Sequence, residues 1–284
     1  MNKFFVIAAL GANPELSSTP SGMAVLKLLL VGERHIIGND GKARNLPFYI
    51  RSEAMGKNAK HLDERGYRQG DILLIEGTAE YSEWDSRTIE GAKDTTIRLK
   101  PIGTVRKLDG DFQVTQDNGG NTRLMGGVNR VQLVGNLVAD VEVKDTTSGP
   151  VATLRLAVNE KYTTREGQPV EKTHWFRVSV WREQAEAMRG VKKGTAVYVE
   201  GALNDDEWKD DQGRDRKSKI IEAESVAVIA PFSGTGAARP QRQSASAPTR
   251  SAQSGPARPA QQRAPSPQAS TGMDLPPEAE DLPF

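Results

Sequence analysis

Apolar and polar residues alternate along several short segments of the chain, as expected of β-strands with one buried face. Turn residues, mainly Gly, Asn and Asp, separate these segments. The alternation predicts strands over residues 23–31, 71–78, 130–138, 151–158, 174–181 and 195–203. Two other segments, residues 52–66 and 182–190, have a helical pattern, and each ends on a glycine suited to a C-terminal cap.

The predicted elements occur twice, which indicates an internal repeat. A shift of 127 residues lays Phe48 on Trp175 and Tyr49 on Phe176, and further along a shift of 124 lays Trp84 on Trp208. The first copy therefore has three more residues between these anchors, which we place in its helical segment. Each copy reads strand, strand, strand, helix, strand, strand, which is the order of an OB barrel. A five-stranded sandwich is the alternative, because element order alone does not fix closure.

The repeat predicts an all-β fold with one short helix per domain, built as two tandem OB-fold five-stranded barrels. We assign residues 1–109 to the first domain, 110–127 to a connector with a turn or short hairpin, and 128–232 to the second domain. Only 37% of the chain is hydrophobic, and residues 233–284 consist mostly of Gly, Ala, Ser, Pro, Gln and Arg. That composition cannot offset chain entropy, so we expect a disordered C-terminal tail.

Residues 174–181 are the most informative strand, because its two faces differ in chemistry. One face is apolar. The other face carries large aromatic and polar side chains: Trp175, Arg177, Ser179 and Trp181. Bases offer flat faces for aromatic rings to stack on, and phosphates attract arginine, so this pattern favours nucleic-acid binding. The alternative is that one Trp lies under the helix while the other caps the barrel.

Further aromatic residues support the first interpretation. Tyr162 and Trp208 lie in two long polar hairpins that cannot easily bury a ring, and Tyr198 lies in a neighbouring strand. The same hairpins carry cations: Lys161, Arg165, Lys172, Lys209, Arg214, Arg216, Lys217 and Lys219. The second hairpin also holds five acidic residues, so its basic cluster alone favours binding only slightly.

Net charge does not point to nucleic acid, because residues 1–232 hold 33 basic and 33 acidic side chains. Affinity for phosphate must therefore come from the local placement of charge. Cysteine is absent and the histidines His35, His61 and His174 occur singly, so we expect no metal site, no cofactor and no enzyme activity. The apolar run at the start is too short for a membrane span, and we expect a cytoplasmic protein.

Three motifs resemble the bacterial single-stranded DNA-binding protein family. They are RVQLVGNL at residues 130–137, THWFRV at 173–178 and GTAVYVEG at 194–201, with Trp208 beyond them. With a diverged first copy and a tail ending in Asp281, Leu282, Pro283 and Phe284, the whole chain is similar to the two-OB form found in Deinococcus and Thermus.

This resemblance implies sequence-independent binding and protection of single-stranded DNA in replication, recombination and repair. It implies that two chains pair as a homodimer with four OB domains, and that the acidic tip Asp281, Leu282, Pro283 and Phe284 recruits partner proteins. The family's stacking positions fall on Tyr162, Trp175, Trp181 and Trp208 in the second copy.

The first copy departs from the family pattern. Its matching positions are His35, Phe48, Ala54 and Trp84, so two of the four stacking platforms are weakened or lost. Its cations Lys42, Arg44, Arg51 and Arg87 offer another way to contact DNA.

Two other classes of protein fit part of the pattern. An RNA-binding OB protein or RNA chaperone would use the same aromatic face, because stacking barely distinguishes the two sugars. An OB-fold interaction scaffold would bind proteins instead, but four intact aromatic positions in the second copy argue against it. We therefore expect a single-stranded DNA-binding protein.

Overall fold

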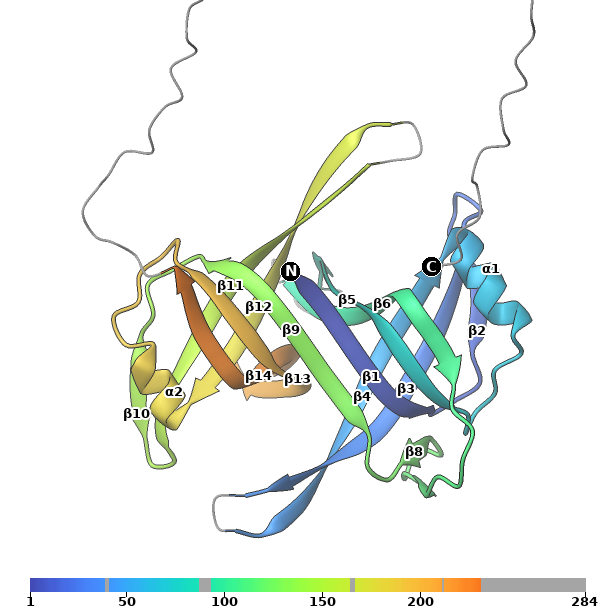
Figure 1. The fold of residues 1–284 in the computed structure, drawn as a ribbon, viewed down its shortest axis with the longest axis horizontal. Coiled ribbons are helices and arrows are strands. Elements are labelled where there is room, and N and C mark those ends of the chain that lie inside the picture. Colours follow the sequence, from blue (N-terminus) through green and yellow to red (C-terminus); the bar gives the residue numbers. More distant parts are fainter. Residues whose placement is uncertain (39–40, 87–92, 164–166, 211, 231–284) are drawn as a thin grey trace, which may run out of the picture. The chain divides into compact units, whose positions relative to one another are not determined.

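The computed structural model describes residues 1–38, 41–86, 93–163, 167–210 and 212–230. The first copy consists of β1 (Asn2–Leu10), β2 (Glu15–Ser18), β3 (Ala24–Ile37), β4 (Ala43–Met55), α1 (Gly56–Glu64), β5 (Ile72–Asp85) and β6 (Lys93–Lys107). The second consists of β9 (Val128–Leu137), β10 (Val143–Thr146), β11 (Gly149–Thr163), β12 (Pro169–Trp181), α2 (Arg182–Ala187), β13 (Ala196–Lys209) and β14 (Asp215–Ala230). Figure 1 shows the two copies joined along β1 and β9.

Each copy closes into a five-stranded barrel. In the second copy, β9 pairs with β11 and β13, β11 pairs with β12, and β14 pairs with both β12 and β13. In the first copy the same ring runs through β1, β3, β4, β6 and β5. The prediction of two OB barrels is confirmed, and the sandwich alternative is wrong, because neither ring has an open edge.

The barrel interiors are filled by every second side chain of each strand, as alternation requires. On β12, the predicted apolar face is core, since Phe176, Val178 and Val180 are at most 1% exposed. On β1, Phe4 and Val6 are buried to the same degree. The opposite residues of each strand therefore point away from the barrel interior.

The connector residues 110–127 contain a short hairpin, as expected, made of β7 (Val114–Gln116) and β8 (Thr122–Leu124). β8 packs beside β3, where Leu124 pairs with Gly32. Contacts group Met1–Phe232 into one unit, so the division into separately folding domains at residues 109 and 128 stays a prediction. The tail expectations for residues 233–284 lie outside the described residues.

Both helices are shorter than predicted. α1 begins at Gly56, because residues 52–55 continue β4, and α2 ends at Ala187. Each helix follows an extended residue and starts with a left-handed one, Gly56 with φ of 62° and Arg182 with φ of 57°. Glycine adopts this conformation without steric penalty, whereas a residue with a side chain loses roughly 1–2 kcal/mol.

Strand pairing corrects the alignment of the two copies. Val25 pairs with Met55, and Val151 pairs with Trp181, so the offset between the copies is 126 residues on both strands rather than 127. Because side chains alternate with period two, this one-residue difference moves every matched position to the opposite face of its strand. The predicted matches in β3 and β4 are therefore displaced by one residue.

One of the three additional residues of the first copy lies in the turn before β3. In the first copy Ser18 pairs with Ala24 across a turn of five residues, whereas Asp145 pairs with Pro150 across four. Only two of the three additional residues therefore lie around the helix, where all three were expected. The turn sets which side chains of the following hairpin point outward.

The long hairpins of each barrel reach the other copy. On β12, Lys172 Nζ lies 2.6 Å from Glu80 Oε1, and the Tyr81 N–H of β5 donates to His174 Nδ1 at 3.2 Å. His174 is 1% exposed, and its Nε2 lies 2.9 Å from Glu160 Oε2. Since Nδ1 accepts a hydrogen bond, Nε2 carries the proton and donates to the carboxylate.

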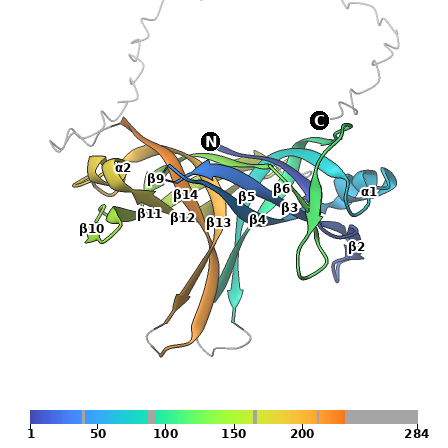
Figure 2. The ribbon, with the colours of Figure 1, turned by 90° about the horizontal axis from the view of Figure 1, so that it is seen from below.

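Three further contacts join the β13–β14 hairpin to the first copy, and Figure 2 shows this hairpin beside β5–β6. Lys219 Nζ donates to the backbone oxygen of Tyr49 at 2.8 Å. Arg216 Nη2 donates to the backbone oxygen of Lys93 at 3.0 Å and lies 3.5 Å from Asp94. Parts of both copies thus lie together around β4 and the β5–β6 hairpin.

Candidate nucleic-acid interface

The outward face of β12 exposes two indole rings. Trp175 is 46% exposed and Trp181 is 38% exposed, although the neighbouring strand residues His174, Phe176 and Val180 are buried. The alternative that one of them packs under the helix is wrong. Outward aromatic side chains on a barrel strand are available for stacking with planar ligands.

Arg177 lies between these two indoles in the strand and contacts the β13–β14 hairpin. Its guanidinium carbon lies 5.3 Å from the centre of the Trp208 ring, within the range of a cation–π interaction. Its Nη2 lies 3.0 Å from Asp206, and its Nη1 donates to Ser218 Oγ at 3.3 Å. Trp208 is therefore held beside a cation while 39% of it stays exposed.

Arg155 extends the cationic part of this surface and was missed by the sequence reasoning. It pairs directly opposite Arg177 in the β11–β12 ladder, so both side chains lie on one face. Within the described part of the chain, Arg155 has no ion pair. Two adjacent guanidinium groups repel each other, and a phosphate between them would offset that repulsion. The position of Arg155 opposite Arg177 can be predicted from the sequence only when the pairing register of β11 and β12 is known.

Two predicted aromatic residues lie elsewhere. Tyr162 is 46% exposed and pairs with Val170 near the end of the β11–β12 hairpin, on the side of the ladder opposite to Trp175. Tyr198 donates a hydrogen bond to Glu200 at 2.8 Å and pairs with Val134 of β9. Tyr198 thus belongs to the surface over β9 and β13, and its role in binding single-stranded DNA stays a prediction.

In the first copy, the corrected offset replaces the expected stacking positions. Tyr49 takes the place of Trp175, and Met55 takes the place of Trp181. Arg51 matches Arg177, and Ile36 replaces His35 as the match of Tyr162. The sequence alone could have predicted the role of Tyr49. Once Arg51 is aligned with Arg177, strand alternation places Tyr49 at the position of Trp175.

Phe48 is a core residue, at 3% exposure. Its ring lies so close to Gly32 and Gly127 that a Cβ there would come within 2.6 and 2.9 Å of it. This burial contradicts the expectation that Phe48 offers a stacking platform. Ala54 is buried as well, whereas His35 is exposed and its Nδ1 makes a hydrogen bond with Asn45 Oδ1.

Tyr49 is oriented by the connector. Its hydroxyl donates to Asp117 Oδ2 at 2.7 Å, and this bond is the main cause of a raised pKa for the Tyr49 hydroxyl. Hydrogen bonds from the Asn121 side chain, and next from Tyr49, lower the pKa of Asp117 to about 2. The β7–β8 turn therefore fixes an aromatic side chain of the first barrel.

A groove of about 640 Å³ brings the first-copy residues together with the second copy. Tyr49, Arg51 and Trp84 line it from the first copy, and Arg216 and Lys217 from the second. Trp84 is 41% exposed. The candidate site of the first copy is thus completed by the β13–β14 hairpin, a feature that reasoning from each copy alone could not find.

Carboxylates neutralise most hairpin cations. Lys217 Nζ lies 2.8 Å from Glu207, whose hydrogen bond raises the pKa of Lys217. Lys219 lies 3.0 Å from Asp205, but burial outweighs that carboxylate and lowers the pKa of Lys219. Other such pairs are Lys161 with Glu171, Lys209 with Asp215, and Arg214 with Asp210. Arg165 and Arg87 lie outside the described residues.

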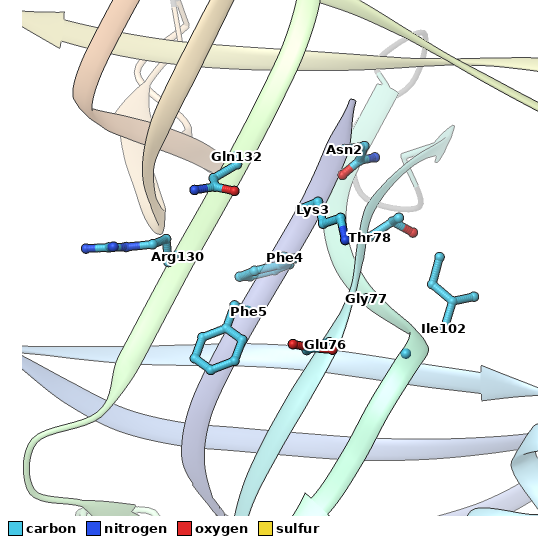
Figure 3. A pocket seen from close by; sticks show the side chains of 11 residues that line it. Asn2, Lys3, Phe4, Phe5, Glu76, Gly77, Thr78, Ile102, Arg130 and Gln132 are labelled. Carbon is cyan, nitrogen blue, oxygen red and sulfur yellow. The ribbon is translucent and has the colours of Figure 1, made fainter. Parts of the chain in front are cut away.

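A separate pocket of about 440 Å³ lies on the outer face of the joined sheets (Figure 3). Phe5 of β1, Ile102 of β6 and Arg130 of β9 line it, and Ile102 is 51% exposed. Arg130 Nη1 lies 3.2 Å from Glu200, the acceptor of the Tyr198 hydroxyl. This outer face combines apolar and charged side chains at the junction of the two copies.

Comparison with known proteins agrees with this arrangement. The family model described as "Single-strand binding protein family" matches residues 1–105 and 128–229, which are the two barrels. The chain is 37% identical to the single-stranded DNA-binding protein of Deinococcus radiodurans over 300 residues, covering 100% of this chain and 99% of that one. It is 32% identical to the Thermus thermophilus protein over 286 residues, covering 100% and 98%.

Among solved structures, the wild-type single-stranded DNA binding protein of Thermus aquaticus matches with a TM-score of 0.62 and 28% identity, covering 81% of this chain and 93% of that one. Two closed OB barrels with outward indoles define a tandem OB-fold protein. The chain belongs to the single-strand binding protein family, and its resemblance to the two-OB form of Deinococcus and Thermus is confirmed. Within the described residues, no helix has both the length and the apolarity to cross a membrane.

The bond between Tyr49 and Asp117 gives a testable titration. We expect the Asp117 carboxyl to titrate near its pKa of about 2, so its contribution to stability disappears as pH falls from roughly 4 to 2. In Tyr49→Phe the pKa should rise but stay below 3.8, because Asn121 still donates to the carboxylate. Carboxyl-carbon NMR measures both values, and equal values in the two proteins would contradict the contact.

Proposed function

We propose that this protein binds single-stranded DNA without sequence preference and protects it during replication, recombination and repair. The observation that carries the proposal is the outward row of Trp175, Arg177 and Trp181 beside Trp208 on a closed OB barrel. The Deinococcus and Thermus relatives, which match the chain over nearly their whole length, are named for single-stranded DNA binding.

The chemistry of this surface suits binding that ignores sequence. Every base has a face that can stack on an indole, and each stack contributes about 1–3 kcal/mol. Arg177 and Arg155 supply positive charge to phosphates, which are the same at every nucleotide. Such binding requires no catalytic group or cofactor, and we propose a non-enzymatic protein.

The first barrel takes part through Tyr49, Arg51 and Trp84. Tyr49 restores an aromatic ring at the position of Trp175, while Met55 at the position of Trp181 presents only an aliphatic side chain. We therefore propose that the first barrel binds the strand more weakly than the second, with the β13–β14 hairpin forming one wall of its groove.

Binding to single-stranded RNA is the second candidate, because aromatic stacking and phosphate contacts serve both nucleic acids. Competition between DNA and RNA oligomers of matched sequence and length decides between them. Preference for RNA would assign the same surface to an RNA-binding protein or RNA chaperone.

We propose that two chains form a homodimer through the outer face shown in Figure 3. That face presents Phe5 and Ile102 at the junction of the two copies, between Lys3, Glu76 and Arg130. An apolar centre with a charged rim is typical of protein interfaces. The dimer would bring four OB barrels together on one strand.

The tail supplies the proposed recruitment of replication, recombination and repair proteins in the cytoplasm. Its tip Asp281, Leu282, Pro283 and Phe284 lies outside the described residues. In the sequence, residues 233–271 hold five arginines and no acidic residue, whereas residues 273–284 hold four acidic residues and no basic one. An acidic tip ending in Phe284 offers a partner one apolar group and several anions.

Stacking predicts that oligothymidine quenches tryptophan fluorescence, and that Trp175→Ala weakens binding by about 1–3 kcal/mol. Fluorescence titration at fixed salt measures both effects. The matched control is Phe112→Ala, which removes an exposed aromatic ring from the connector and should leave affinity unchanged. Unchanged emission at saturating DNA would refute stacking on these indoles.

The homodimer predicts a mass in solution of twice the 30.9 kDa of one chain. Phe5→Glu places a charge in the proposed contact and should give monomers with unchanged circular dichroism, because Phe5 lies outside the barrel core. Light scattering at micromolar concentration measures the mass, with Phe112→Glu as control. A monomeric parent protein would contradict the proposal.

If the tip recruits partner proteins, changes in the tip should separate recruitment from DNA binding. Deleting residues 281–284, or changing Phe284→Ala, should leave affinity for single-stranded DNA equal or slightly higher while abolishing capture of replication and repair enzymes from a lysate. Gln253→Ala, a change elsewhere in the tail, should capture as the parent does. If the truncated protein retains the same partners, recruitment resides in another part of the chain.

A further inference from the structure

Arg182 has a left-handed backbone conformation at the junction between β12 and α2. The other copy has Gly56 at the same junction between strand and helix, with φ of 62° against 57° for Arg182. Within the described residues, Arg182 is the one residue other than glycine with positive φ. A side chain kept in this unfavourable conformation points to a role for that side chain.

The guanidinium of Arg182 has no partner in the part of the chain that the structure describes. The side chain is exposed, and it passes over the turn between β10 and β11, where a Cβ built on Gly149 would lie 3.4 Å from Arg182 Cγ. By contrast, Arg177 and Arg189 both make ion pairs of 3.0 Å or shorter. Arg182 is therefore a cation without an ion pair.

Arg182 also lies beside an exposed indole. It lines a groove of about 430 Å³ together with Trp181 and Ser148. Two carboxylates, Glu183 and Glu222, line the same groove, and Glu222 already accepts a hydrogen bond from Asn204 Nδ2 at 2.6 Å. Besides these two carboxylates, the groove combines a stacking surface, a hydroxyl and a guanidinium that has no ion pair among the described residues.

We propose that Arg182 forms a phosphate subsite on the second barrel. It binds the phosphodiester next to the nucleotide whose base stacks on Trp181. Guanidinium groups bind phosphate through paired hydrogen bonds, and this contact would offset the unfavourable backbone conformation when DNA is present. The inference rests on the proposed binding of single-stranded DNA and adds a position to it.

Salt dependence of binding tests the subsite. Arg182→Gly and Arg182→Asn remove the charge and suit the left-handed backbone, so both variants should melt at or above the temperature of the parent protein. For oligothymidine, the slope of log affinity against log salt should become shallower by about 0.7, the value for one phosphate contact on a single strand. Lys60→Asn removes an exposed cation on α1 that has no ion pair with the residues the structure describes, and this variant should keep the parent slope.

Coupling to Trp181 tests the location. In a Trp181→Ala background, Arg182→Asn should weaken binding by a smaller factor than in the parent, because the neighbouring nucleotide is no longer fixed. Equal factors in the two backgrounds, or an unchanged slope in the single variants, would overturn the subsite. If the parent protein itself fails to bind single-stranded DNA, the proposed function fails instead, so the two failures are distinguishable.

Discussion

The antiparallel ladder between β1 and β9 determines how the rest of the structure is arranged. It runs from Asn2 paired with Leu133 to Ile7 paired with Val128, and it sets the two barrels side by side in one chain. From this placement the long hairpins reach across the junction. The ion pair of Lys172 with Glu80 depends on it, as do the contacts of the β13–β14 hairpin. Each candidate site therefore lies beside residues of the other copy.

Much of the fold could be predicted from the sequence because strand alternation and element order are local properties. The buried and exposed faces of β12 followed from its period of two. The first-copy site could not be predicted in the same way, because the single additional residue between Ser18 and Ala24 reverses the faces of the hairpin after it. Phe48 and Tyr49 thus exchanged roles, although the two residues are adjacent in the chain.

Other parts of the site depend on contacts that sequence patterns do not contain. The unpaired state of Arg182 and its backbone conformation follow from the junction of β12 with α2, not from its residue type. Cationic side chains look alike in the sequence, yet carboxylates neutralise Lys217 and Lys219, while Arg155 and Arg51 make no ion pair within the described residues. Net charge therefore does not predict which residues of this chain bind phosphate.

The contact of Lys219 with the backbone of Tyr49 has a consequence for how the two halves can evolve. In an assembly of identical copies, one substitution changes every equivalent interface at once. In this chain the two sides of the junction are encoded separately, and Phe48 occupies the place that His174 holds in the other barrel. Covalent fusion thus releases the halves from symmetry, so that one barrel can specialise in its ligand while the other specialises in supporting it.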